Sequence, residues 1–317
     1  MNKDFYNELA GAAGNACILT DEPMSGHTTF GIGGPADYLV IPKDMQTLRE
    51  GILLCRREGV PFFIMGNGSN LLVGDGGYRG VIFKIFRTMD DMQEREETTE
   101  PGEGSAGSSR LFAEAGAGIM LSVFAHRICQ LGYTGAEFMT GIPGTLGGAV
   151  TMNAGAYNGE TADTILWAQV MDTDGNVQKF YKEDLQMGYR SSTVMKKGLI
   201  VLRAAFSFEK GDPEQIREKV RTLSQARREK QPLEYPSAGS TFKRPEGYFA
   251  GKLIEDCGLK GYAIGGAQVS EKHAGFLINR GGADAAQMRR LITYVQDTVF
   301  EKFGVRLEPE VRFIGEF

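Results

Sequence analysis

The stretch that most restricts how this chain can fold runs from residue 141 to residue 156 and reads GIPGTLGGAVTMNAGA. It holds five glycines and no charged side chain. Because glycine has no Cβ, the backbone here can approach other atoms more closely than other residues allow. The stretch is therefore either a connector packed beneath other elements or a strip of backbone that lies against a large non-protein ligand.

A second stretch of small residues, GNGSN at 66–70, directly follows the run PFFIM, which is typical of a short buried strand. Successive backbone N–H groups in such a turn form a nest for an anion, although a tight structural turn has the same composition. The stretch has neither the Gly-Lys-Ser/Thr ending of a P-loop nor a GxGxxG motif that opens a helix. Together the two stretches predict one long ligand. A dinucleotide has that length, a pyrophosphate that needs N–H donors, and flat rings that need close, uncharged contacts.

The composition excludes several classes of protein. Of 317 residues, 35 are basic and 40 acidic, so the chain lacks the dense basic face of a nucleic-acid-binding protein. No apolar run approaches the roughly 20 residues that cross a bilayer, and the N-terminus does not resemble a secretory signal. We expect a cytoplasmic protein without a membrane partner, and nothing in the sequence indicates an obligate protein partner.

Cysteine and histidine are sparse. The cysteines, at positions 17, 55, 129 and 257, are too far apart for a CxxC motif or a zinc site, and the three histidines form no HExxH motif. No bound metal is therefore expected. Cys55 and Cys129 fall on the apolar sides of predicted helices, which predicts buried thiols.

Hydrophobic periodicity predicts a mixture of strands and helices. A hairpin is expected over 165–181 and a final strand over 305–315. The acidic, Gly/Ser-rich segment 87–110 has no apolar period and predicts a mobile surface insertion, such as a long hairpin loop. The mixture favours an α+β fold over a doubly wound parallel sheet. The other expected strands are 36–42, 61–65, 81–86 and 199–208, and the expected helices are 44–59, 119–131, 213–230, 283–303 and a short one within 248–258.

Seven motifs occur in an order that resembles the UDP-N-acetylenolpyruvoylglucosamine reductase (MurB) family of bacterial cell-wall synthesis, from about Thr28 to Ile314. They read TTFGIGGPADYLV, GNGSNLLV, GIPGTLGGAVTMNAGAYNGE, GYRSS, PSAGSTFKRP, GLKGYAIGGAQVSEKHAGFLIN and LEPEVRFIG. The short link after YNGE is similar to the type II variant, which lacks an extra tyrosine-bearing loop. The insertion departs from the family's compact pattern, but it lies between the motifs.

The resemblance implies a fold and a reaction. It implies an FAD-binding fold of the vanillyl-alcohol-oxidase (PCMH) type in two parts, followed by an α+β substrate-binding domain. The reaction would reduce UDP-N-acetylglucosamine enolpyruvate to UDP-N-acetylmuramate, with non-covalent FAD as cofactor and NADPH as co-substrate. The expected boundaries are 1–87 and 111–212 for the two FAD-binding parts, 88–110 for the insertion, and 213–317 for the substrate-binding domain.

Three residues match the family's catalytic positions. Arg190 corresponds to the active-site arginine, and a planar guanidinium suits a carboxylate that gains charge. Ser240 corresponds to the proton donor, and Glu310 to the catalytic glutamate that shares in stabilising the enolate. Without the resemblance, the same residues would be read as a surface arginine, a turn serine and a solvated strand face.

The resemblance also implies binding residues. Arg227 and Lys230, three residues apart on one helix face, are expected to hold the UDP diphosphate, although a solvated basic turn has the same pattern. Weaker candidates for the sugar nucleotide are Lys243, Arg244, Lys252, Gln268 and Ser270. The expected FAD contacts are Gly66, Asn67, Gly68, Ser69, Asn70, Gly141, Ile142, Pro143, Gly144, Thr145, Gly147, Gly148, Asn153, Ala154, Gly155 and Arg190.

Two other interpretations stay open at this point. An FAD-dependent oxidase of the same fold would share the glycine stretches, although such enzymes often tether flavin through His or Cys, and no histidine lies in either stretch. A non-catalytic sugar-nucleotide-binding module would keep the cradle without needing Arg190, Ser240 and Glu310 together.

Overall fold

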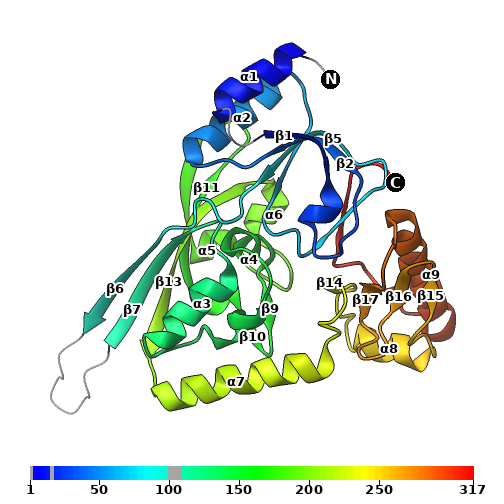
Figure 1. Cartoon of the computed structure of the whole chain (residues 1–317). Helices are drawn as coiled ribbons and strands as arrows, with labels where there is room; N and C mark the ends of the chain where they lie inside the picture. Colours follow the sequence, from blue (N-terminus) through cyan, green and yellow to red (C-terminus); the bar gives the residue numbers. More distant parts are fainter. Residues whose placement is uncertain (1–2, 15–17, 99–108) are drawn as a thin grey trace. The chain divides into compact units, whose positions relative to one another are not determined.

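The computed structural model describes residues 3–14, 18–98 and 109–317, and Cys17 and residues 99–108 of the predicted insertion lie outside these ranges (Figure 1). The chain forms two compact units that are interleaved along the sequence. Unit 1 comprises residues 1–18, 40–66 and 83–226, and unit 2 comprises residues 19–39, 67–82 and 227–317. The expected division into segments 1–87, 88–110, 111–212 and 213–317 stays a prediction. The two units are defined by contacts between residues, whereas the expected segments are defined by function.

A large antiparallel sheet forms the centre of unit 1. Its strands lie in the order β12 (Val177–Tyr181), β11 (Ile165–Met171), β13 (Ile200–Lys210), β7 (Ser109–Gly116) and β6 (Met92–Thr98), and β8 (Tyr133–Thr134) also pairs with β13. The predicted hairpin over 165–181 is confirmed by β11 and β12. At its turn Gly175 has φ 79°, a conformation that favours glycine.

The predicted loop over 87–110 is wrong for Met92–Thr98, which form the edge strand β6 and pair with β7 (Figure 1). No apolar alternation marked this strand, because almost all of its side chains are exposed. Ion pairs hold it in place: Arg127 binds both carboxylate oxygens of Glu94, and Arg203 binds Asp91 beside the strand. The strand is therefore fixed by its backbone ladder and by charge and not by a buried face.

Helices of unit 1 pack apolar faces against these strands and against one another. The rings of Phe124 on α3 (Leu121–Gln130) and Phe206 on β13 are 5.1 Å apart. α2 (Met45–Arg57) is capped by Asp44, whose carboxylate accepts the Thr47 N–H at 2.8 Å. The other elements of unit 1 are α1 (Lys3–Ala13), which the sequence analysis did not predict, α4 (Leu146–Met152), α5 (Lys182–Leu185), α6 (Thr193–Lys197), α7 (Pro213–Lys230, which ends in unit 2), β3 (Phe62–Met65), β9 (Gly155–Ala156), β10 (Gly159–Glu160), η2 (Glu137–Gly141) and η3 (Thr161–Asp163).

Unit 2 holds a second sheet of strands in the order β14 (Ser237–Ser240), β17 (Phe276–Asn279), β16 (Ala267–Val269) and β15 (Ala263–Ile264). Its core joins the helix α8 (Ala250–Asp256) and the long helix α9 (Ala285–Phe303) to the sheet through Ile254, Leu277 and Val295, which are all fully buried. The remaining elements are η1 (Met24–His27), the adjacent strands β1 (Ile18–Pro23), β2 (Pro35–Val40) and β5 (Tyr78–Lys84), and the parallel pair β4 (Leu71–Val73) and β18 (Arg312–Ile314).

The final strand is shorter than expected. Instead of a strand over 305–315, only Arg312–Ile314 form β18. The preceding segment forms a single antiparallel bridge between Pro309 and Phe242. Proline has no N–H to donate to a ladder, so the strand cannot extend back through it. Glu310 consequently lies in an irregular segment and not on a regular strand face.

The content of helix and strand confirms the predicted α+β fold class. In the part of the chain that the structure describes, no helix has both the length and the apolar character that a membrane span needs. Within the same residues, no three His, Cys, Asp or Glu side chains gather in a way that could hold a metal ion.

Candidate functional site

The two glycine stretches meet inside unit 1. Gly66 directly follows β3, and a Cβ built on it would lie 2.3 Å from Oγ1 of Thr145, which is in the second stretch. A side chain at position 66 would therefore overlap a buried threonine. The two distant segments are therefore in contact at this point, and their binding of one long ligand stays a prediction.

The second stretch is not bare backbone throughout, because it contains the helix α4. Thr145 caps its N-terminus by accepting the Gly148 N–H at 3.4 Å, and Asn153 ends it in the left-handed conformation with φ 45°. Leu146 and Val150 are fully buried and fasten the helix to the core. The sequence did not predict this helix, because two of its seven residues are glycines, which disfavour helices.

The glycines of this stretch are small for two different reasons. A Cβ on Gly147 would lie 2.9 Å from Cβ of Ala117, and one on Gly155 would lie 2.7 Å from the Gly159 carbonyl oxygen. Packing alone requires glycine at both positions. A Cβ on Gly148 would meet only Oγ1 of Thr145, at the ordinary contact distance of 3.6 Å. Gly148 is exposed, as are Gly141 and Pro143, so the stretch has an exposed, uncharged edge at Gly148.

The first stretch continues from Gly66 into unit 2. Gly68 has φ 67°, a conformation that favours glycine, and its carbonyl accepts the Thr29 N–H at 3.2 Å. Asn70 donates its side-chain N–H to the Glu310 carbonyl at 3.0 Å, and its own carbonyl accepts the Arg312 N–H at 3.0 Å. The end of the first stretch is thus tied to the segment that carries Glu310.

Arg190 lies on a tight turn in unit 1, next to the second stretch. Gly188 and Ser191 exchange two backbone hydrogen bonds of 3.0 Å, so Tyr189 and Arg190 form the tip of the turn. Arg190 has φ 51°, a conformation that non-glycine residues rarely adopt. Its guanidinium donates to the Gly155 carbonyl at 3.1 Å. The structure therefore brings a predicted catalytic cation and the glycine stretch together.

Ser240 and Glu310 lie on hydrogen-bonded segments of unit 2. The Glu310 N–H donates to the Thr241 carbonyl at 2.8 Å, directly after Ser240. Ser240 is exposed at the end of β14, and Glu310 is half-buried. Gly239, before the serine, has φ 76°, and a Cβ placed on it would have nothing within 4 Å. The Ser240 side chain is therefore accessible from solvent.

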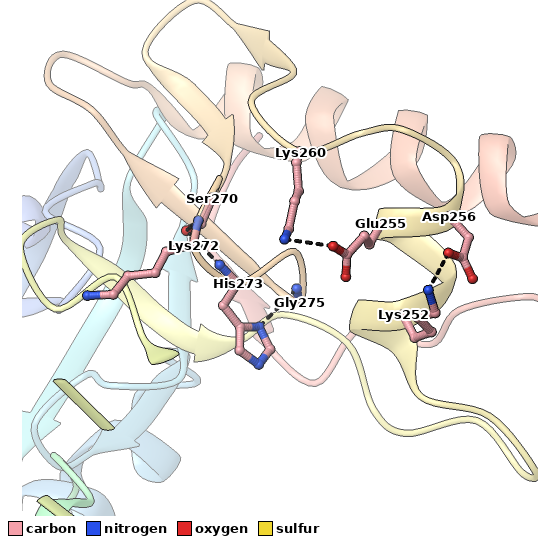
Figure 2. A network of polar contacts seen from close by, with 8 residues as sticks. All are labelled: Lys252, Glu255, Asp256, Lys260, Ser270, Lys272, His273 and Gly275. Atoms are coloured by element: carbon pink, nitrogen blue, oxygen red, sulfur yellow. Dashed lines mark hydrogen bonds and ion pairs between the residues drawn. The ribbon is translucent and has the colours of Figure 1, made fainter. Parts of the chain in front are cut away.

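Three of the basic substrate candidates have partners in the protein. Lys252 forms an ion pair with Asp256, one helical turn away on α8, at 2.6 Å (Figure 2). Lys243 pairs with Glu308, and the Arg244 guanidinium stacks 4.0 Å from the centre of the Phe249 ring. The carboxylate beside Lys252 raises the pKa of its ammonium group, which keeps it charged.

Two further substrate candidates, Gln268 and Ser270, are buried and bind the backbone. The Gln268 side chain donates to the Gly261 carbonyl at 2.8 Å. Oγ of Ser270 accepts the Lys272 and His273 N–H groups, each at 3.2 Å, and so closes the turn drawn in Figure 2. Burial lowers the pKa of His273, and its Nδ1 accepts the Gly275 N–H at 3.1 Å. These contacts give the turn its shape.

The two remaining candidates lie at the end of α7. Arg227 is half-buried and Lys230 is exposed. Two residues that support the site, Ser192 and Thr241, were not predicted from the sequence. Ser192 is fully buried and donates to the Thr151 carbonyl at 2.6 Å, and Oγ1 of Thr241 accepts the Leu277 N–H at 3.1 Å. In the sequence, the only indication of their role is that they lie close to Arg190 and Ser240 in the GYRSS and SAGSTF motifs.

Comparisons with known proteins agree along nearly the whole chain. A family model described as an FAD binding domain matches residues 36–181, and one described as the C-terminal domain of UDP-N-acetylenolpyruvoylglucosamine reductase matches residues 231–314. A UDP-N-acetylenolpyruvoylglucosamine reductase of Clostridium botulinum (strain Hall) is 49% identical over 314 residues, which cover 99% of this chain and 98% of that protein. The reductase of Lachnoclostridium phytofermentans is 50% identical over 316 residues, or 100% and 99% of the two chains. The crystal structure of the Thermus caldophilus reductase (MurB) matches with a TM-score of 0.74 and 31% identity over 94% of this chain and 98% of that one.

Proposed function

Because the chain belongs to the UDP-N-acetylenolpyruvoylglucosamine reductase family, we propose that it reduces UDP-N-acetylglucosamine enolpyruvate to UDP-N-acetylmuramate with electrons from NADPH. It is an oxidoreductase of peptidoglycan precursor synthesis with an FAD-binding domain. Family membership favours this function over an oxidase of the same fold and over a non-catalytic binding module.

The two glycine stretches would hold the FAD. The contact between Gly66 and Thr145 and the uncharged, exposed edge at Gly148 support this assignment. Backbone N–H groups of Asn67–Asn70 suit the pyrophosphate, as successive amides in a turn do. Bound FAD supplies the hydride that the enolpyruvyl double bond accepts, and the protein supplies binding, orientation and charge.

Arg190 would bind the carboxylate of the enolpyruvyl group. That carboxylate gains negative charge when the adjacent double bond takes up a hydride at its terminal carbon. A fixed guanidinium stabilises such charge more than a mobile one, because no reorganisation is needed during the reaction. The turn at Gly188–Ser191 and the bond to Gly155 give Arg190 that fixed position within unit 1.

Ser240 would donate the proton to the carbon next to the carboxylate, and Glu310 would help to stabilise the charged intermediate. The observation that carries this part of the proposal is the hydrogen bond between the Glu310 N–H and the Thr241 carbonyl, which joins the two segments. A serine hydroxyl is a weak acid, but an enolate is basic enough to accept its proton. We assign the UDP diphosphate to Arg227 and Lys230, where two cations lie on one face of α7.

An anaerobic experiment separates the two half-reactions. NADPH should bleach the flavin of the wild-type protein, and UDP-N-acetylglucosamine enolpyruvate should restore its colour. In Ser240→Ala, NADPH should still bleach the flavin, but recovery should be slower by about 100-fold to about 10,000-fold, the usual contribution of a general acid. Ser237→Ala, on the same strand, is the matched control and should recover like the wild type.

The outcomes are distinct. A wild-type protein whose reduced flavin reacts with oxygen but not with the enolpyruvyl substrate would be an oxidase. A protein that stays colourless after FAD is added would be a binding module. Wild-type recovery in Ser240→Ala would remove this serine from the mechanism while leaving the reductase function intact.

A further inference from the structure

The backbone of Arg190 is in a conformation that needs support. A non-glycine residue at φ 51° lies in the left-handed region, which costs of order 1 kcal/mol for a residue with a Cβ. The turn around it has only two residues at its tip, and Tyr189 is exposed. The orientation of the guanidinium therefore depends on what holds the two ends of the turn.

Asn153 holds one of those ends. Its side-chain N–H donates to the Gly188 carbonyl at 3.1 Å, and its side-chain oxygen accepts the Ala162 N–H at 2.9 Å. The residue is fully buried, and its own φ of 45° places it at the end of α4. Both ends of its amide are thus used by the protein, and they link the turn of Arg190 to the glycine stretch.

Ser192 holds the other end of the turn. Its hydroxyl donates to the Thr151 carbonyl on α4 at 2.6 Å and accepts the Met195 N–H at 3.1 Å. With the bond from Arg190 to Gly155, three contacts join the turn to the last residues of α4 and the strand after it. Of the three, only the Asn153 contact is made by the side-chain amide of a fully buried residue.

We infer that Asn153 is a positioning residue that orients Arg190 by holding the Gly188 carbonyl, rather than a residue whose side chain binds the cofactor. The inference rests on the proposed role of Arg190. It replaces the expectation that the Asn153 side chain contacts FAD, since that side chain already bonds Gly188 and Ala162. All the residues on which the inference rests lie in unit 1.

Two substitutions separate the role of the amide from that of the backbone. Asn153→Gly keeps a left-handed backbone at no steric cost and removes the whole side chain. Asn153→Asp keeps an acceptor for the Ala162 N–H but turns a second oxygen towards the Gly188 carbonyl. Asn158→Gly is the matched control, because Asn158 also has a positive φ, of 67°, and its side chain is exposed.

The expected result is a loss of kcat without a loss of cofactor. Asn153→Gly should lower kcat about tenfold, because the Gly188 carbonyl loses one of its two hydrogen-bond donors, and Asn153→Asp should lower it further. The dissociation constant of FAD, measured by flavin fluorescence, should stay within about threefold of the wild-type value. Asn158→Gly should leave both quantities unchanged. A larger loss of FAD affinity in Asn153→Gly, with kcat kept at saturating FAD, would overturn the inference.

A double-mutant cycle with Arg190→Ala tests the coupling directly. If Asn153 acts through Arg190, Asn153→Gly should change kcat less than about twofold in the Arg190→Ala background. Fully multiplicative losses would overturn the inference and leave the role of Arg190 intact. Wild-type turnover by Arg190→Ala would instead overturn the proposed role of Arg190, and the inference with it. If Asn153→Gly does not fold, the near-isosteric Asn153→Asp carries the same cycle.

Discussion

Replacing Gly148 and Gly66 by alanine, one at a time, distinguishes a glycine kept for a ligand from a glycine kept for packing. At position 66 the new Cβ would lie 2.3 Å from Oγ1 and 3.1 Å from Cγ2 of Thr145, which is buried and caps α4. Overpacking costs about 1–3 kcal/mol, and a lost threonine cap costs about 1 kcal/mol. Gly66→Ala should therefore lower the stability of the FAD-free protein by about 2–4 kcal/mol.

Position 148 should behave in the opposite way. The new Cβ would meet only Oγ1 of Thr145, at 3.6 Å, so the protein has room for it. Alanine is also a better helix former than glycine, by up to about 1 kcal/mol. The FAD-free variant should be as stable as the wild type or slightly more stable. If FAD lies on this exposed edge, the methyl group overpacks the contact by about 1–3 kcal/mol and weakens FAD binding about fivefold to about 150-fold.

Urea unfolding of the FAD-free proteins and titration with FAD, followed by flavin fluorescence, measure the two effects separately. Alanine at Gly11 is a useful reference, because nothing lies within 4 Å of its Cβ position and the residue lies on α1. If Gly148→Ala binds FAD as tightly as the wild type, the exposed edge of the stretch does not contact the cofactor, and the assignment of the cradle fails.

Two further predictions concern titratable groups. Burial alone would raise the pKa of Glu137, but hydrogen bonds from Thr134 Oγ1 and the Gly135 N–H lower it below its ordinary value. A lowered pKa in the folded state stabilises the protein above the unfolded-state pKa of about 4.3, and this stabilisation is lost as the pH falls. When urea unfolding is measured between about pH 7 and pH 3, the free energy of unfolding should therefore fall less steeply towards acid pH in Glu137→Gln than in the wild type. Burial raises the pKa of the Cys55 thiol to about 12, so iodoacetamide at about pH 8 should label Cys55 only after the protein unfolds. Mass spectrometry of the digested protein measures the labelling. If Cys55 of the native protein is labelled as fast as in the unfolded protein, the prediction is wrong.

The sequence predicted those elements whose stability is local or follows from periodicity. The helix α2 has an aspartate cap and an apolar face that includes Leu48 and Ile52, and both features correspond to local patterns of residue types in the sequence. The hairpin of β11 and β12 carries its own turn residues, Asp172 and Gly175, and the Asp172 carboxylate accepts the Asp174 and Asn176 N–H groups at 2.9 Å. Such signals act within a few residues and need no knowledge of the rest of the fold.

Elements fixed by distant partners were missed. α4 forms although Gly147 and Gly148 disfavour it, because Leu146 and Val150 are buried against other segments. β6 has no apolar face, and its ladder with β7 cannot be read from an acidic sequence. For the same reason the motifs identified Ser240 and Glu310 one at a time, and only the backbone pairing around Phe242 and Pro309 shows that their segments are neighbours.

The backbone of Arg190 argues for a functional role of its side chain. Arg190 has φ 51°, although it is not glycine, and its guanidinium is bonded to the Gly155 carbonyl. Glycine at Arg190 would relieve the backbone strain, so stability alone does not account for an arginine there. The strain is explained if the guanidinium is needed at this point, and the buried bonds of Asn153 and Ser192 then offset its cost.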